Sequence, residues 1–364
     1  MDYRYTQFDP SLLQMRQLLE RLRALFEHLL LQTNGDVDEA LRWLERIAER
    51  YSLFGDRLNI DDFKKFIEGE KLVRPAPRGG LELTKKGERG LRTGSLEAIF
   101  GNLRKDSAGD HRVAAHGVGH ERLPETRPFV FGDPVSLVAT NETLANAIRR
   151  GGVDDISITE EDLAVYETEH NSSCATVLLI DVSHSMILYG EDRITPAKKV
   201  ALALTELITT KYPKDSLNVV LFGDEAWEVP LDELPYCGVG PFHTNTRAGL
   251  LLAREILRKK RQANRQIFMV TDGKPSALTE RNGEIYKNPF GLDTRVVNKT
   301  LEEADQCRRV GIPITTFMLT QDPALVDFIE TFTRTNRGRA YYAGADRLGS
   351  FVFVDYIQNR RRRS

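Results

Sequence analysis

Two apolar runs in the second half of the chain each end in an aspartate, and this pattern restricts the possible folds. Residues 176–180 (TVLLI) and 266–271 (QIFMVT) are rich in β-branched and other apolar side chains. Such uninterrupted runs are typical of strands buried on both faces of a parallel sheet. Asp181 follows the first run and Asp272 follows the second. Because open α/β sheets place their ligands at the carboxyl ends of the strands, we expect both acids at one ligand-binding edge.

The segments around these two runs alternate between strand and helix patterns. Further short strands are expected at 217–222, 226–229, 314–319 and 339–343, and helices at 196–212, 247–260, 294–310, 323–335 and from about 348. Strands that alternate with helices predict an α/β fold, here a doubly wound, Rossmann-like and mainly parallel sheet flanked by helices.

Three hydroxyl side chains accompany the two acids. Ser183 and Ser185 follow Asp181 closely, and Thr244 precedes a predicted helix. Carboxylates and hydroxyls are hard oxygen ligands that suit Mg²⁺ or Mn²⁺, and no Cys or His pair with zinc-like spacing accompanies them. Two carboxylates neutralise a divalent ion, and neutral hydroxyl ligands leave that ion strongly electrophilic. If one coordination position stays open, an acidic side chain from another protein could fill it. The residues therefore predict a metal site that binds rather than catalyses.

The same residues resemble a known signature. The sequence DVSHS at 181–185 is similar to the DxSxS motif of the von Willebrand factor A (VWA) domain, Thr244 aligns with that family's threonine, and Asp272 aligns with its TDG aspartate. The resemblance extends from Ser172 to the end of the chain. It implies a metal-ion-dependent adhesion site, in which the serines and the threonine contact the metal and the two aspartates act largely through water.

The resemblance also implies a partner. Cytoplasmic bacterial members similar to this chain, of the CoxE-like and magnesium-chelatase D-subunit-like types, commonly act with a AAA+ ATPase of the MoxR or chelatase kind. An adaptor or substrate-presenting role beside such an ATPase is therefore the specific expectation, and it rests on family analogy.

One loop departs from the family pattern. Many relatives have glycines before the threonine, whereas this chain has Pro241, Phe242 and His243. Thr246 also carries a hydroxyl and is an alternative ligand, although alignment favours Thr244.

The first part of the chain has a different character. Residues 1–120 predict a mainly helical domain, with helices at 12–31, at 37–51 behind an expected capping box of Asp36 with Glu39, and from Asp61 or Asp62. Residues 121–171 are expected to be a linker and connecting segment with a helix at 141–150, and residues 172–364 to be the VWA domain.

Two other groups of polar residues have alternative interpretations. A basic cluster could be part of a DNA-binding module, but charge runs usually mark a solvated helix face, which we favour; it comprises Lys85, Lys86, Arg89 and Arg92. His116 and His120 have a spacing that binds metal on a helix, but the glycines between them disfavour a helix, so loop histidines are expected there, together with His111.

Composition limits the remaining functions. The net charge of -2 argues against nucleic-acid binding by the whole surface, and the three cysteines have spacings unlike a disulfide framework. A polar start and the absence of a long apolar run lead us to expect a soluble cytoplasmic protein.

Enzymatic functions are poorly supported by the motifs. The sequence has no G-x-S-x-G elbow, P-loop or G-x-G-x-x-G fingerprint, so we expect no enzyme. A metal-dependent hydrolase that uses the same site is the main alternative, with Asp224 and Glu225 as the only obvious reserve acids. A DNA-linked regulator is a further alternative.

Overall fold

The computed structural model describes residues 10–54, 58–77, 79–106, 121–129, 138–152, 157–169, 173–190, 192–262, 264–272, 274–288, 290–320, 322–342 and 347–362. The three histidines at 111, 116 and 120 lie outside these residues.

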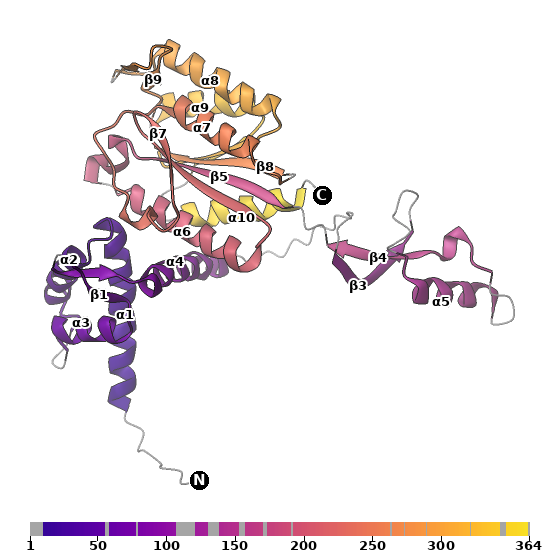
Figure 1. The fold of residues 1–364 in the computed structure, drawn as a ribbon, viewed down its shortest axis with the longest axis horizontal. Coiled ribbons are helices and arrows are strands. Elements are labelled where there is room, and N and C mark those ends of the chain that lie inside the picture. The colour runs from indigo at the N-terminus through magenta and orange to yellow at the C-terminus, as the bar shows by residue number, and fades with distance from the viewer. Residues whose placement is uncertain are drawn as a thin grey trace, which may run out of the picture.

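A six-stranded sheet forms the centre of the second half of the chain (Figure 1). Its order is β12 (Arg339–Tyr342), β11 (Ile314–Met318), β8 (Asn264–Thr271), β5 (Cys174–Asp181), β6 (Ser216–Phe222) and β7 (Ala226–Val229). All neighbours are parallel except β7, which runs antiparallel to β6 at one edge. The predicted α/β fold with a mainly parallel, doubly wound sheet is confirmed.

Helices cover both faces of this sheet, which explains why its inner strands are rich in apolar side chains. α6 (Ile194–Lys211) and α10 (Leu348–Arg362) lie on one face, and α7 (Thr246–Arg258), α8 (Thr294–Arg309) and α9 (Pro323–Asn336) lie on the other. Side chains of β5 alternate between two cores: Leu178 and Ile180 face α6, whereas Val177 and Leu179 face α7. A short hairpin of β9 (Ala277–Thr279) and β10 (Ile285–Lys287) follows β8.

The first hundred residues form the predicted helical region. They contain α1 (Pro10–Gln32), α2 (Val37–Arg50), α3 (Ile60–Gly69), a hairpin of β1 (Val73–Pro75) and β2 (Leu81–Leu83), and α4 (Lys85–Asp106). Asp36 caps α2 by accepting a hydrogen bond from the Glu39 backbone at 2.8 Å. A reciprocal capping box occurs instead at α3, between Asn59 and Asp62, so α3 begins slightly before the predicted residues.

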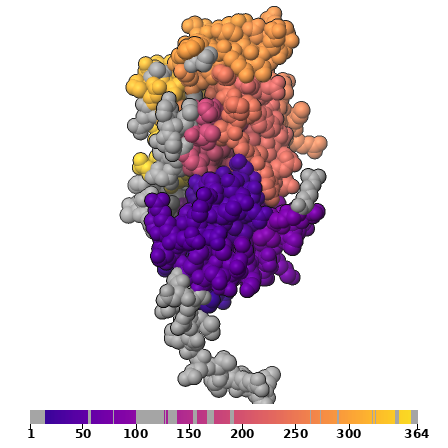
Figure 2. Space-filling view, turned by 90° about the vertical axis from the view of Figure 1, so that its left-hand side faces the viewer, coloured from indigo at the N-terminus to yellow at the C-terminus, as the bar shows by residue number. Residues whose placement is uncertain are grey.

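This helical region packs directly on the α/β domain (Figure 2). One continuous apolar core includes residues of α1 to α4 together with residues of α6 and α10. Within this interface Lys198 of α6 is almost fully buried, and its Nζ donates hydrogen bonds to Leu31 O at 2.9 Å, Asn34 Oδ1 at 2.8 Å and Pro235 O at 3.3 Å. Lys198 therefore joins the α1–α2 turn, α6 and the loop before Thr244.

Lys198 gives this packing a pH dependence. Burial lowers the pKa of Lys198 from its ordinary 10.5 to about 8, although interactions with Cys237 and Asp192 oppose the shift. Between these pH values the unfolded chain binds more protons at this position than the folded chain, so the free energy of unfolding rises with pH. Relative to Lys198→Met, the wild-type protein should gain up to about 3 kcal/mol over this pH range, as measured by urea unfolding of both proteins. A difference between the two proteins that stays constant with pH would contradict this.

Residues 121–169 contain more regular structure than a linker pattern indicates. β3 (Glu121–Pro128) pairs antiparallel with β4 (Ala164–Glu169), and between them lie α5 (Thr140–Gly151) and a single turn of 3₁₀ helix, η3 (Glu160–Asp162). The predicted helix at 141–150 corresponds to α5. Asp162 is buried and accepts hydrogen bonds from Arg150 and Thr159, which connects α5 to the turn before β4. This segment is thus a small folded unit, drawn to the side of the main body in Figure 1.

In the described part of the chain, no helix is long and apolar enough to cross a membrane. All three cysteines carry free thiols, with Cys174 and Cys307 buried and Cys237 partly exposed.

Candidate metal site at the carboxyl edge of the sheet

Asp181 is the last residue of β5 and is completely buried. Its Oδ1 accepts a hydrogen bond from the Ser183 backbone at 2.9 Å, and its Oδ2 accepts one from the Thr271 hydroxyl at 2.5 Å. Within the described residues, no Lys, Arg or His side chain donates a hydrogen bond to this carboxylate. Burial raises the pKa of Asp181 to about 7, and the nearby carboxylate of Asp272 contributes to that rise. A buried carboxylate with only neutral donors is unfavourable, so a cation fits this position.

A chain of hydrogen bonds connects the next three predicted residues. The hydroxyl oxygens of Ser183 and Ser185 lie 3.1 Å apart, and the Ser185 hydroxyl donates to Asp272 Oδ1 at 2.7 Å. The second oxygen of Asp272 forms an ion pair with the Arg193 guanidinium. The structure thus brings two loops, which follow β5 and β8, together at one edge of the sheet.

The segment that contains Phe242 and Thr244 is held against both of these loops through hydrogen bonds of its main chain. The Thr244 N–H donates to Ser276 Oγ at 3.0 Å, and the Thr244 carbonyl accepts from the N–H groups of Ser276 and Ala277. On the other side, the His184 N–H donates to the Phe242 carbonyl at 3.1 Å. The Thr244 side chain is buried, and its hydroxyl makes no hydrogen bond with any described residue. This hydroxyl therefore has both of its lone pairs available for a ligand.

Asn245 and Thr246 have a different position from Thr244. Asn245 is the N-cap of α7, and its Oδ1 accepts a hydrogen bond from the Ala248 N–H at 3.1 Å. Because Asn245 caps the helix, α7 begins at Thr246, one residue before the predicted start. The main chain of Thr244 is hydrogen-bonded to the segment beyond β8, which favours Thr244 as the metal ligand. The choice between Thr244 and Thr246 stays a prediction.

Phe242, in the loop that departs from the family pattern, packs against an aromatic neighbour. Its ring contacts Trp227 edge to face, with centroids 6.1 Å apart. Gly223 and Gly240 border this ring so closely that a Cβ at either position would overlap it. A side chain at either glycine would therefore displace the Phe242 ring.

The metal would depend on hydroxyl ligands as well as on carboxylates. Among the described residues, no group of three or more His, Cys, Asp and Glu side chains is placed to hold a metal ion. The five predicted residues offer two carboxylates and three hydroxyls, a donor set that suits a hard divalent cation. The residues present therefore fit Mg²⁺ or Mn²⁺.

Three neighbouring residues of the site were not predicted from the sequence. Thr271 binds Asp181, Ser276 binds Thr244, and Arg193 binds Asp272. Thr271 is the first residue of the TDG motif and Ser276 lies three residues beyond its end, so a search of the hydroxyl residues in and after that motif could have found them. Arg193 lies 79 positions from its partner, and no spacing pattern connects the two.

Asp224, the reserve acid for a hydrolase, has a structural role. Its Oδ2 accepts a hydrogen bond from Lys287 Nζ at 2.6 Å, and its Oδ1 accepts one from the His243 backbone at 2.9 Å. Burial raises the pKa of Asp224, but these hydrogen bonds and the charge of Lys287 lower it by more, so the net shift is downward. A carboxylate with a lowered pKa is a weak general base near neutral pH.

The basic cluster lies on α4. Lys86 donates hydrogen bonds to Glu70, and Arg92 forms an ion pair with Glu206 of α6 at 3.4 Å. Two of the four basic side chains therefore connect α4 to its neighbours, which supports the helix-face interpretation.

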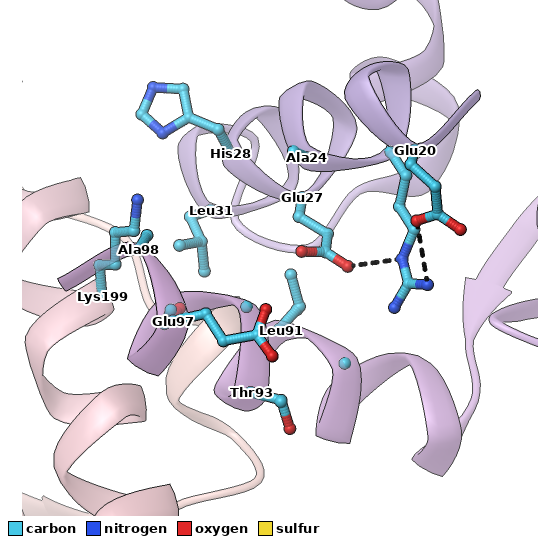
Figure 3. Close-up of a pocket in the computed structure, with 14 residues that line it drawn as sticks. Glu20, Ala24, Glu27, His28, Leu31, Leu91, Thr93, Glu97, Ala98 and Lys199 are labelled. Carbon is cyan, nitrogen blue, oxygen red and sulfur yellow. Dashed lines mark hydrogen bonds and ion pairs between the residues drawn. The ribbon is translucent and has the colours of Figure 1, made fainter. Parts of the chain in front are cut away.

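A cavity of about 500 Å³ lies between α1 and α4 (Figure 3). Arg23 contacts the carboxylates of Glu20 and Glu27 on its wall, and burial raises the pKa of Glu27. Lys199 of α6 and Glu97 of α4 complete the charged lining. Charges of both signs line this cavity, and no residue of the predicted metal site is among them.

A doubly wound sheet of this kind, with a DxSxS loop at its carboxyl edge, defines a VWA-type domain. The family described as "Rv0959-like protein, vWA domain" matches residues 174–357, and that described as "Rv0959-like protein, third domain" matches residues 121–168. The chain therefore belongs to the Rv0959-like family of vWA-domain proteins.

Similar proteins include curated relatives and solved structures. "Uncharacterized protein Rv0959" of Mycobacterium tuberculosis and "Uncharacterized protein Mb0984" of Mycobacterium bovis are each 31% identical over 370 residues, which cover 98% of this chain and 53% of theirs. The chain thus spans about half the length of the curated relatives it matches. Two solved structures are similar to part of the chain. The PilB minor pilin from Streptococcus sanguinis has a TM-score of 0.42 at 15% identity, covering 57% of this chain and 67% of the pilin. The vWF domain of the type V pili tip protein Mfa5 from Porphyromonas gingivalis has a TM-score of 0.39 at 14% identity, covering 51% of this chain and 96% of that domain.

Proposed function

We propose that the chain is a metal-dependent protein-interaction module. In this proposal Mg²⁺ or Mn²⁺ is held by the five residues Asp181, Ser183, Ser185, Thr244 and Asp272, and an Asp or Glu side chain of a partner protein completes the coordination. The observation that carries the proposal is the carboxylate of Asp181, which is fully buried, accepts hydrogen bonds from neutral donors alone among the described residues, and lies close to a second carboxylate. A divalent cation is the simplest group that would stabilise this arrangement.

Each residue has a defined part in this function. Asp181 and Asp272 supply negative charge from two different strands, and the hydrogen bonds of Ser185 and Thr271 fix their orientations. Ser183, Ser185 and Thr244 supply neutral oxygen atoms. When bound, the metal supplies a positively charged position that prefers a carboxylate ligand.

The partner in the proposal is a AAA+ ATPase of the MoxR or chelatase type, which the chain would serve as an adaptor in the cytoplasm. This part rests on the resemblance of the motif to cytoplasmic VWA proteins and on the free thiols of all three cysteines. A hydrolase receives less support, because Asp224 is bonded to Lys287 and is not available as a base. A DNA-linked regulator receives less support, because Lys86 and Arg92 bind carboxylates of the chain itself.

Capture of partners from a lysate of the source cell tests this function. Immobilised wild-type protein should retain its partner in Mg²⁺ and release it in EDTA, whereas Asp181→Ala should retain it in neither buffer. Mass spectrometry of the retained protein then identifies whether it is an ATPase. If the same proteins bind to both chains in both buffers, the metal site is not the interaction surface.

A further inference from the structure

Arg193 places a permanent positive charge next to the proposed metal position. It precedes α6, and its backbone N–H donates to the Met186 carbonyl at 3.0 Å, which fixes it beside the serine loop. Its Nη1 contacts Asp272 Oδ2, and in this pair the arginine side chain is 16% exposed and the aspartate side chain is completely buried. The other oxygen of Asp272 accepts the hydrogen bond from Ser185. Arg193 and Ser185 thus share the two oxygens of one carboxylate.

This arrangement changes the charge of the site. When a cation is bound, the carboxylates of Asp181 and Asp272 carry two negative charges, and the guanidinium of Arg193 carries one positive charge. The three side chains together are therefore singly negative, and with a divalent cation the site becomes singly positive. Without Arg193 the same two carboxylates and the cation would be neutral. Because water is largely excluded here, a difference of one charge has a substantial effect on an incoming ligand.

We propose that Arg193 is a specificity-determining residue, which gives the metal-loaded site its preference for an anionic ligand and weakens the binding of the metal itself. Both effects have one physical cause. A cation beside Asp272 repels a second cation, so metal affinity falls, and it adds one positive charge near the bound metal, so a carboxylate is attracted while a neutral amide is not. The inference rests on the proposed function, because it assumes that a metal binds at this site.

The test compares two binding reactions in wild-type protein and Arg193→Gln. Mn²⁺ binding is measured by isothermal titration calorimetry, and binding of acetate or of the neutral acetamide to the Mn²⁺-loaded protein is measured by the relaxation rate of water protons. Arg193→Gln should bind Mn²⁺ about 5- to 10-fold more tightly and acetate about 5- to 10-fold more weakly, with acetamide unchanged. Arg193→Lys, which keeps the charge, should retain the preference for acetate.

A matched control is available on the opposite face of the sheet. Arg254 of α7 forms an ion pair with Glu303 at 2.6 Å with nearly the same exposure, 17% and 6%. Arg254→Gln should leave both binding reactions unchanged. If Arg193→Gln weakens Mn²⁺ and acetate together, or changes neither, the inference is wrong although the proposed function stands. If wild-type protein binds no Mn²⁺, the proposed function itself fails, and the inference fails with it.

Discussion

The Ile180→Asp variant is expected not to fold. Ile180 is completely buried on β5, where it lies opposite Leu221 of β6 and Val270 of β8 and packs in the core shared with α6. A carboxylate there would have no cationic partner and no access to water, which costs several kcal/mol. Typical domains are stable by only about 5–15 kcal/mol, and the change also removes a large apolar side chain. Circular dichroism during urea unfolding measures the effect.

An exposed apolar residue provides the control for this substitution. Val310, at the end of α8, is 44% exposed, and Val310→Asp introduces the same charge without burying it. It should unfold cooperatively within about 0.5 kcal/mol of the wild-type protein. A cooperative transition near the wild-type midpoint for Ile180→Asp would mean that β5 is not the central strand.

Asp181→Asn is expected to leave the fold intact and to abolish the response to metal. Asparagine has the same shape, and its oxygen can still accept the hydrogen bond from Ser183. The buried negative charge disappears, so the metal-free protein should be at least as stable as the wild type. A cation that binds only the folded wild-type chain should raise its Tm, by mass action.

Thermal unfolding with and without excess Mn²⁺ measures this response, since a ligand at about 100 times its Kd contributes about 2.7 kcal/mol. The wild-type Tm should rise and the Tm of Asp181→Asn should not. Asp305→Asn is the control, because Asp305 lies on α8 and binds Arg308 and Arg309. Equal rises in all three proteins would indicate metal binding elsewhere on the chain.

The two strands that end at the candidate site could be predicted because the side chains they need are adjacent in the sequence. β5 and β8 are covered by helices on both faces, so they need continuous apolar side chains, and that run ends where the polar loop begins. Residues of the DxSxS and TDG fragments are then fixed to one edge by the direction of the strands. The helix starts were less accurate, because caps such as Asn59 and Asn245 depend on which neighbouring backbone groups lack a partner.

Contacts between distant residues could not be predicted in the same way. The ion pair of Arg193 with Asp272 and the hydrogen bonds of Lys198 to the α1–α2 turn depend on packing between separate elements. β3 was also missed, since ERLPETRP is polar and contains proline, so it shows no strand alternation. Pairing with β4 provides the hydrogen bonds that its composition does not indicate.

A titration with Mn²⁺, followed by electron paramagnetic resonance, shows whether the carboxyl edge of the sheet holds a divalent metal. Only free Mn²⁺ gives a strong signal in solution, so bound metal is counted as signal lost. We expect one tightly bound Mn²⁺ per wild-type chain, displaced by Mg²⁺, and none in Asp181→Asn. Equal binding by both chains, or no binding by the wild-type chain, would contradict this expectation.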